Sequence, residues 1–272
     1  MIFYPPCKIN LGLHVLERRK NGYHTIETAM IPLKYPVDIL EILHSTTGYP
    51  EIKVTGRFAV ENGKDNLCYK AYQLLAQDFN LPPLKLHLHK QIPFGAGLGG
   101  GSADAAYTLL GIRDFLNLPL ENCDLELYAQ KLGSDVPFFL WNTPMFAAGR
   151  GEVLSPLELD LKSLYITLVK PAFEVSTAEA YGGIIPQQPE KDLRTVLNQD
   201  IMTWKNDLKN DFEDSVFSRY PVLQEIKDKL YESGAIYAAM SGSGSTVFAL
   251  SKIPLKLRCL DLKDFFMTSF QF

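Results

Sequence analysis

Five glycines fall within ten residues near the middle of the chain, in the run Pro93-Phe94-Gly95-Ala96-Gly97-Leu98-Gly99-Gly100-Gly101-Ser102. We call this run the glycine loop. Residues 84–88 before it alternate between apolar and polar side chains, as in a strand, and residues 102–117 after it follow a helical pattern. Glycine lets backbone N–H groups approach phosphate oxygens closely, and the N-terminus of the following helix attracts the same anion. The order of strand, loop and helix therefore predicts a phosphate-binding site.

The glycine loop differs from two common nucleotide-binding loops. Gly95, Gly97 and Gly100 satisfy the dinucleotide pattern G-x-G-x-x-G, but they follow a β-rich region in which we expect no parallel crossovers. A Walker loop needs Gly-Lys-Ser/Thr at its end, whereas this loop ends in Gly101-Ser102 without a lysine. The sequence therefore favours neither a Rossmann nor a Walker site.

Composition describes an ordinary globular protein of one large domain or two smaller ones. The chain has 272 residues, of which 46% are hydrophobic and 21% charged. Its net charge of −4 argues against a broad basic surface for nucleic acid or anionic membranes. Pro5, Pro6 and Lys8 interrupt the N-terminus where a secretory signal needs an apolar run, so we expect a cytoplasmic protein. Four scattered cysteines indicate reduced thiols rather than a zinc site or disulfides: Cys7, Cys68, Cys123 and Cys259.

The spacing of apolar residues predicts strands and helices throughout the chain. Residues 8–15 alternate as a half-buried strand, which places Lys8 and Asn10 on one face, and Asn21-Gly22 predicts a turn. Asn66 is a natural N-cap for a helix. We expect further strands at 37–42, 51–54 and 164–169, helices at 66–79 and 124–132, and a strand–loop–strand around 241–245. The pattern is α+β, with a boundary predicted between residues 155 and 162.

Four more motifs accompany the glycine loop in order along the chain. They are Pro6-Cys7-Lys8-Ile9-Asn10-Leu11, Gly22-Tyr23-His24, Gly133-Ser134-Asp135-Val136-Pro137-Phe138-Phe139 and Gly149-Arg150-Gly151-Glu152. Together with Gly97-Leu98-Gly99-Gly100-Gly101-Ser102 they resemble the GHMP kinases, although Cys7 stands where alanine is usual. The resemblance implies a two-domain α+β fold. It assigns residues 1–155 to an ATP-binding N-terminal domain like domain 2 of ribosomal protein S5, and residues 156–272 to a ferredoxin-like C-terminal domain.

The resemblance also implies an activity, the transfer of the γ-phosphate of ATP to the hydroxyl of a small molecule. Lys8 and Asp135 become the catalytic pair, with Asp135 as the base and Lys8 as the cation near the phosphate charge. Mg²⁺ is the expected metal; its ligands are not identified, and Ser102 is the candidate. The residues implied in ATP binding are Asn66, Pro93, Phe94, Gly95, Ala96, Gly97, Leu98, Gly99, Gly100, Gly101, Ser102 and Ala103.

A third set of residues is implied in binding the acceptor. The resemblance implies that Gly22-Tyr23-His24 helps to hold a cytidine of the acceptor, by means of aromatic rings. The implied residues are Asn10, Tyr23, His24, Thr177 and Tyr181. The segment Ser241-Gly242-Ser243-Gly244-Ser245, which we call the second glycine loop, resembles a family motif beside the phosphate loop.

Residue types alone leave plainer roles open. Lys8 and Asn10 are compatible with a solvated strand face, Asp135 and Asn66 with helix N-caps, and Tyr181 with a packed or surface aromatic. Within the family, a homoserine-type or mevalonate-type kinase is the alternative, and a non-catalytic nucleotide sensor is a further one. Such a sensor is expected to lose Lys8 or Asp135, and both are present. The sequence leaves the oligomer open between monomer and homodimer, and no motif explains residues 182–209.

Overall fold

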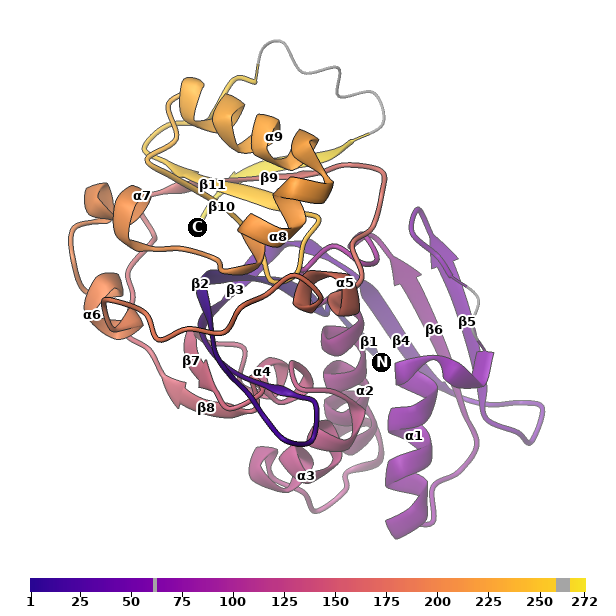
Figure 1. Ribbon diagram of the computed structural model, residues 1–272. Helices are drawn as coiled ribbons and strands as arrows, with labels where there is room; N and C mark the ends of the chain where they lie inside the picture. The colour runs from indigo at the N-terminus through magenta and orange to yellow at the C-terminus, as the bar shows by residue number, and fades with distance from the viewer. Residues whose placement is uncertain (61–62, 258–264) are drawn as a thin grey trace. The chain divides into compact units, whose positions relative to one another are not determined.

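The computed structural model describes residues 1–60, 63–257 and 265–272, which form two compact units (Figure 1). Unit 1 contains residues 1–8, 32–94 and 99–143, and unit 2 contains residues 9–31, 95–98 and 144–272. Each unit is thus assembled from separate stretches of the chain, and the contiguous division at 155/156 stays a prediction. Cys7 and Cys68 are buried thiols and Cys123 is an exposed one, while Cys259 lies outside the described residues.

Unit 1 contains a four-stranded sheet in the order β1-β4-β6-β5. Its strands are β1 (Ile2–Phe3), β4 (Ile39–His44), β5 (Glu51–Gly56) and β6 (Leu84–Lys90). β4 pairs antiparallel with β1 and β6, whereas β5 and β6 are parallel. The expectation of no parallel crossover before the glycine loop is therefore wrong, because α1 (Leu67–Asp78) connects β5 to β6.

The described residues of unit 1 also form four α-helices, which follow the 3₁₀ turn η1 (Gly63–Asp65). They are α1, α2 (Gly100–Leu116), α3 (Asn122–Leu132) and α4 (Val136–Trp141). The predicted helices at 66–79, 102–117 and 124–132 match α1, α2 and α3 to within two residues. α2 packs against α1, α3, α4 and strand β4, so the helix that follows the glycine loop is the centre of this unit.

A second sheet has the order β2-β3-β7-β8 and carries the hairpin predicted at Asn21-Gly22. Its strands are β2 (Pro6–Arg18), β3 (His24–Val37), β7 (Met145–Ala148) and β8 (Val153–Pro156). β2 is buried on both faces from Pro6 to Val15, so the prediction of a half-buried strand is wrong. The polar residues Lys8, Asn10 and His14 are therefore buried, and each needs a polar partner to offset the loss of water.

Unit 2 also holds an antiparallel sheet in the order β10-β11-β9-β12. Its strands are β9 (Tyr165–Lys170), β10 (Tyr237–Met240), β11 (Val247–Ser251) and β12 (Phe266–Gln271). Its helical segments are α5 (Thr177–Tyr181), α6 (Leu193–Leu197), η2 (Ile201–Thr203), α7 (Trp204–Asp207), α8 (Phe212–Arg219) and α9 (Pro221–Glu232). α9 packs on β10 and β11 through Leu223, Ile226 and Leu230, which recur at helical spacing and are fully buried.

A buried charge cluster fixes both ends of the glycine loop in unit 1. The Lys90 ammonium contacts the carboxylates of Asp38 and Asp104, and its Nζ lies 2.6 Å from Asp104 Oδ2. The other oxygen of Asp38 accepts hydrogen bonds from the N–H groups of Gln91 and Ile92 at 2.6 and 2.9 Å. Lys90 ends β6 and Asp104 lies in the first turns of α2, so one cation joins the strand before the loop to the helix after it.

The protonation of this cluster follows from its burial. Desolvation raises the pKa of Asp104 to about 8, an effect that Lys90 opposes and Asp38 reinforces. For Lys90, burial lowers the pKa, but attraction to Asp104 and Asp38 outweighs it, and the net shift is upward. Asp104 Oδ1 is buried with no hydrogen-bond partner among the described residues, which disfavours the charged carboxylate. The cluster therefore takes up a proton on folding at neutral pH.

Asp104→Asn should flatten the pH dependence of stability. In the folded state the Asp104 carboxyl group keeps its proton up to about pH 8. In the unfolded chain the same group loses its proton near its ordinary pKa of 3.8. Between these values the free energy of unfolding falls as pH rises, because the folded chain binds one more proton than the unfolded chain. Urea unfolding between pH 5.5 and 8.5 would measure the slope in wild type and variant.

Asp114→Asn is the matched control, because Asp114 lies on the same helix and pairs with Arg113 at an exposed position. This variant should keep the wild-type slope. Equal slopes in wild type and Asp104→Asn would contradict the uptake of a proton by Asp104.

Candidate functional site

Lys8 and Asp135, the predicted catalytic pair, form an ion pair within unit 1. Lys8 Nζ lies 3.3 Å from Asp135 Oδ2. The lysine is buried, with 3% of its surface exposed, whereas 32% of the Asp135 side chain remains accessible. A buried ammonium is tolerated only with a nearby counter-charge. The pair therefore presents a carboxylate that a reactant can reach, with a fixed cation behind it.

Asp135 occupies the N-cap position of α4 but does not use its side chain as a cap. Its backbone has φ −85° and ψ −12°, and its carboxylate makes no capping hydrogen bond to the helix. Pro137, in the first turn, has no N–H to be satisfied. The expected N-cap position of Asp135 is thus confirmed. Its carboxylate, however, pairs with Lys8 and does not cap the helix.

The start of α2 lies against the same lysine. Gly99 is the N-cap of α2 with φ +70°, and a Cβ there would lie 3.1 Å from Lys8 Cε and 2.9 Å from Phe139 Cζ. Any larger residue would be strained and would push Lys8 away. The N-terminus of a helix carries a positive partial charge, so the Lys8 ammonium and α2 together favour an anion in this part of unit 1.

Glycine is required in the glycine loop for two different reasons. Gly95, Gly97 and Gly99 have φ of +58°, +72° and +70°, a region that L side chains rarely adopt. Gly100 begins α2 and is not among the described glycines with positive φ. A Cβ on Gly100 would instead lie 2.8 Å from Ile92 Cγ2, so close packing excludes larger residues there.

Residues 95–98 belong to unit 2, where they lie against the second glycine loop. Ser241 Oγ donates a hydrogen bond to the carbonyl of Gly97 at 2.8 Å, and Thr246 N–H donates to the carbonyl of Ala96 at 3.2 Å. A Cβ on Gly97 would lie 1.9 Å from the carbonyl oxygen of Ser241. The backbones of the two segments therefore approach as closely as only glycine permits.

Two predicted acceptor residues also contact the second glycine loop. The Asn10 N–H donates to Ser241 Oγ at 3.2 Å, and its side-chain amide donates to Thr28 Oγ1 at 3.1 Å. Asn10 is buried, so the alternative of an exposed strand residue is wrong. Thr177, the first residue of α5, is exposed, and its Oγ1 lies 3.5 Å from Ser243 Oγ.

The three aromatic residues predicted to hold a base lie in unit 2. His24 and Tyr181 stack on each other, with ring centroids 4.5 Å apart and planes at 15°. Tyr181 also meets the edge of Phe212 at 4.8 Å, which buttresses it from another side. Tyr23 is 55% exposed, and the Arg150 guanidinium lies 5.0 Å from its ring centre. Partial burial and the nearby Arg18 lower the pKa of His24, so its ring is neutral at pH 7.

Asn66 and Ser102 lie at the starts of α1 and α2. Asn66 Oδ1 accepts a hydrogen bond from Cys68 N–H at 2.9 Å, so this side chain caps α1. Ser102 is half-buried in the first turn of α2. Within residues 1–60, 63–257 and 265–272, no cluster of three or more His, Cys, Asp or Glu side chains could hold a metal ion.

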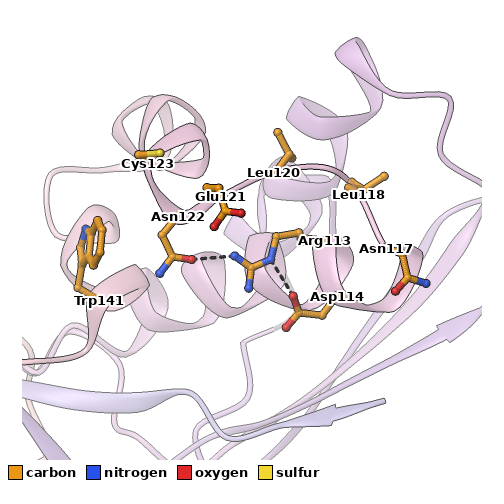
Figure 2. Close-up of a pocket in the computed structure, with 9 residues that line it drawn as sticks. All are labelled: Arg113, Asp114, Asn117, Leu118, Leu120, Glu121, Asn122, Cys123 and Trp141. Carbon is orange, nitrogen blue, oxygen red and sulfur yellow. Dashed lines mark hydrogen bonds and ion pairs between the residues drawn. The ribbon is translucent and has the colours of Figure 1, made fainter.

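An open pocket of about 810 Å³ lies on unit 1 but contains none of the predicted site residues (Figure 2). Its cation, Arg113, is bound by Asp114 and Asn122, each at 2.7 Å. The pocket is lined by Arg113, Asp114, Asn117, Leu118, Leu120, Glu121, Asn122, Cys123 and Trp141. In the described part of the chain, every helix is too short or too polar to cross a membrane.

Sequence reasoning missed the polar residues behind the site. Lys90 continues the register of Leu84, Leu86 and Leu88 on the buried face of β6, so the alternation that predicts the strand also predicts a buried lysine. On α2 the apolar-looking residues Tyr107 and Leu110 are only half-buried, whereas Asp104 is buried beside Lys90. Asn210, just after the segment without a motif, is buried as well.

Comparisons with known proteins agree with the architecture and with the motifs. Residues 66–143 match the family model of the GHMP kinases N terminal domain, and residues 191–254 match GHMP kinases C terminal. A protein of Azobacteroides pseudotrichonymphae named 4-diphosphocytidyl-2-C-methyl-D-erythritol kinase is 48% identical, covering 94% of this chain and 95% of its own length. One of Parabacteroides distasonis with the same name is 49% identical, covering 93% of both chains.

A solved structure resembles most of the chain in the same way. The crystal structure of a 4-(cytidine 5'-diphospho)-2C-methyl-D-erythritol kinase superposes with a TM-score of 0.77 and 31% identity, over 92% of this chain and 90% of that one. Mevalonate kinase of Methanococcus jannaschii shares the fold, with a TM-score of 0.68 at 15% identity over 99% and 97% of the two chains. Sequence and fold therefore agree that this chain belongs to the GHMP kinase family.

Proposed function

We propose that this chain transfers the γ-phosphate of ATP to the 2-hydroxyl of 4-diphosphocytidyl-2-C-methyl-D-erythritol, in the synthesis of isoprenoid precursors by the non-mevalonate route. The observation that carries the proposal is the Lys8–Asp135 ion pair at the start of α2, which holds a base and a cation in one place. The names of relatives at 48% and 49% identity support the choice of acceptor. We place the reaction in the cytoplasm.

Each member of the pair has its own chemical task. Asp135, whose side chain is 32% exposed, accepts the proton of the acceptor hydroxyl as that oxygen attacks the γ-phosphate. Lys8, fixed by burial, supplies positive charge where negative charge develops on the transferred group. The N–H groups of the glycine loop and of the first turn of α2 hold the phosphates of ATP.

Mg²⁺ fits this set of residues as a companion of the nucleotide. Mg²⁺ keeps several waters and binds mainly through phosphate oxygens and one or two protein oxygens, so it needs no cluster of carboxylates. Ser102 offers a hydroxyl in the first turn of α2, whereas Asp104 is bound to Lys90 and cannot serve. When bound, the ion neutralises charge on the phosphates of ATP.

The acceptor's cytosine would bind against the aromatic residues of unit 2. His24 and Tyr181 stack at 4.5 Å, whereas a base between two rings needs about 7 Å between them. The base therefore displaces His24 and stacks on the ring of Tyr181, and the exposed ring of Tyr23 offers a further face. Neutral His24 can donate one hydrogen bond to a base edge and accept another.

Asp135→Asn should lower kcat by ~10²-fold or more, because an amide cannot accept the hydroxyl proton. ATP affinity, measured by calorimetry, should change little, since the change is isosteric. Asp65→Asn is the matched control: Asp65 pairs with Lys70 at 3.4 Å on the exposed surface of the same unit. A near-normal kcat in Asp135→Asn would remove Asp135 from the mechanism.

Tyr181→Ala should weaken the binding of CMP by about ten- to a hundredfold, since a base stack contributes ~1–3 kcal/mol. Calorimetric titration of wild type and variant with CMP measures the change, and ATP affinity should stay constant. Tyr220→Ala serves as the control, because Tyr220 also stacks on an aromatic ring of unit 2, that of Phe173 at 4.8 Å. If wild type fails to bind CMP, or Tyr181→Ala binds it normally, the cytidine pocket is wrong.

A further inference from the structure

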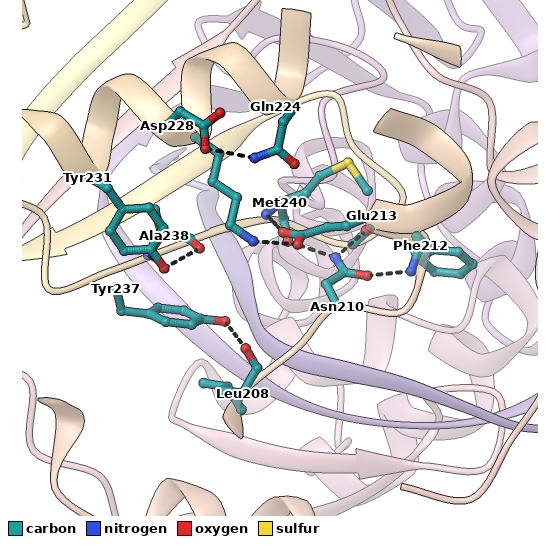
Figure 3. A network of polar contacts seen from close by, with 12 residues as sticks. Leu208, Asn210, Phe212, Glu213, Gln224, Asp228, Tyr231, Tyr237, Ala238 and Met240 are labelled. Carbon is teal, nitrogen blue, oxygen red and sulfur yellow. Dashed lines mark hydrogen bonds and ion pairs between the residues drawn. The ribbon is translucent and has the colours of Figure 1, made fainter. Parts of the chain in front are cut away.

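In the described part of the chain, side chains instead of another strand complete the outer edge of strand β10. Among these residues β10 pairs only with β11 and ends the sheet order, so the backbone polar groups of Ala238 and Met240 point away from the partner strand. The Tyr231 hydroxyl accepts from the N–H of Ala238 at 3.1 Å and donates to its carbonyl at 3.2 Å. At Met240, Glu213 accepts from the N–H at 2.7 Å and Asn210 donates to the carbonyl at 2.7 Å (Figure 3).

Asn210 reaches beyond the strand into the second glycine loop. Its amide nitrogen donates a second hydrogen bond to the carbonyl of Gly242, at 2.9 Å. Its oxygen accepts from the N–H of Phe212 at 3.0 Å, at the start of α8. The side chain is buried, so these bonds do not compete with water. Only a donor of two hydrogen bonds can bind both carbonyls, and a carboxylate of the same shape would repel them.

Two further contacts hold Asn210 in place. The backbone around it forms a bridge with β2: Leu13 N–H donates to Lys209, and Asp211 N–H donates to Leu13, each at 2.9 Å. The carbonyl of Asn210 accepts from Glu213 N–H at 2.9 Å. Glu213 in turn accepts from Lys227 Nζ at 2.5 Å, so a half-buried ion pair anchors the first turn of α8.

The loop that Asn210 binds is the one that contacts the glycine loop in unit 2. Gly242 has φ +55°, and Ser241 beside it bonds to the carbonyl of Gly97 and to the N–H of Asn10. A displacement of the Gly242 carbonyl therefore moves Ser241, and with it the hydrogen bonds to Gly97 and Asn10.

We propose that Asn210 is a positioning residue for nucleotide binding, which holds the second glycine loop against residues 95–98 through its two hydrogen bonds to Met240 and Gly242. Glu213 and Lys227 support it by fixing the start of α8. The inference rests on the proposed function, because it assumes that the glycine loop binds ATP. Tyr231 supports β10 in the same way at Ala238, two residues before Met240. Ala238 lies outside the second glycine loop, so we expect Tyr231 to contribute to stability and not to nucleotide binding.

Asn210→Asp tests the assignment with Tyr231→Phe as its matched control. Both changes remove donors from the outer edge of β10, and both should lower the melting temperature. Asn210→Asp should also weaken ATP binding by about tenfold or more, since both buried hydrogen bonds to the carbonyls of Met240 and Gly242 are lost and the two carbonyls then face an acceptor. Tyr231→Phe should bind ATP as the wild type does. Calorimetric titration with ATP, far below both melting temperatures, measures the difference, and CMP affinity should be unchanged in both.

Hydrogen exchange of the peptide that spans residues 237–247 supplies a second readout. Asn210→Asp should expose the amides of the second glycine loop to faster exchange, and Tyr231→Phe should leave those amides protected. If Asn210→Asp does not fold, Asn210→Ser carries the same test, because one hydroxyl can serve only one of the two carbonyls.

Normal ATP affinity in a folded Asn210 variant, or an equal loss in Tyr231→Phe, would overturn the proposal. The titration needs no acceptor, so an error in the proposed acceptor leaves this readout intact. Suppose that the wild type phosphorylates the acceptor, but Asn210→Asp and Tyr231→Phe bind ATP with equal affinity. The proposed function would then stand, and the positioning role of Asn210 would be wrong.

Discussion

The buried ammonium of Lys90 is the constraint on which the glycine loop depends. It binds Asp38 and Asp104, and Asp38 also accepts from the backbone of Gln91 and Ile92 directly before the loop. A segment with five glycines loses much conformational freedom on ordering. Lys90 ends the strand before the loop and binds the helix after it, so both ends of the loop are held. The loop therefore loses less conformational entropy when it becomes ordered. Positive φ at Gly95, Gly97 and Gly99 then gives it the shape that close backbone approach requires.

Two buried lysines of unit 1, Lys90 and Lys8, differ in how accessible their carboxylate partners are. Lys90 faces two buried carboxylates, one of them with a pKa raised to about 8 by burial, and its charge is used inside the protein. Lys8 pairs with the carboxylate of Asp135, which keeps 32% of its side chain accessible. In the proposed mechanism, the accessible Asp135 carboxylate serves as the base for a hydroxyl and Lys8 supplies charge to a phosphate. Because α2 begins beside Lys8 and carries Asp104, it connects the two lysines.

The sequence predicts the elements well because their apolar periodicity is local. The strand at 84–88, the helices at 66–79 and 102–117 and the N-cap at Asn66 follow from neighbouring residues and are confirmed. Burial of both faces of β2 and the parallel pairing of β5 with β6 depend on distant segments. The predictions of a half-buried strand and of no parallel crossover were therefore wrong. Lys8 and Asp135 were placed by family motifs, since no spacing rule brings residues 127 positions apart together. No sequence pattern pointed to Asn210, because its role depends on hydrogen bonds to the carbonyls of Met240 and Gly242, which are distant in the sequence.

The acceptor is the central claim, and a comparison of acceptors tests it most directly. The purified chain would be supplied with Mg²⁺ and ATP, and release of ADP would be measured with 4-diphosphocytidyl-2-C-methyl-D-erythritol, homoserine, mevalonate and galactose. The account predicts rapid, saturable release with the cytidine-containing alcohol and only background release with the other three. Release that is fastest with homoserine, mevalonate or galactose, or at background level with all four, would contradict it.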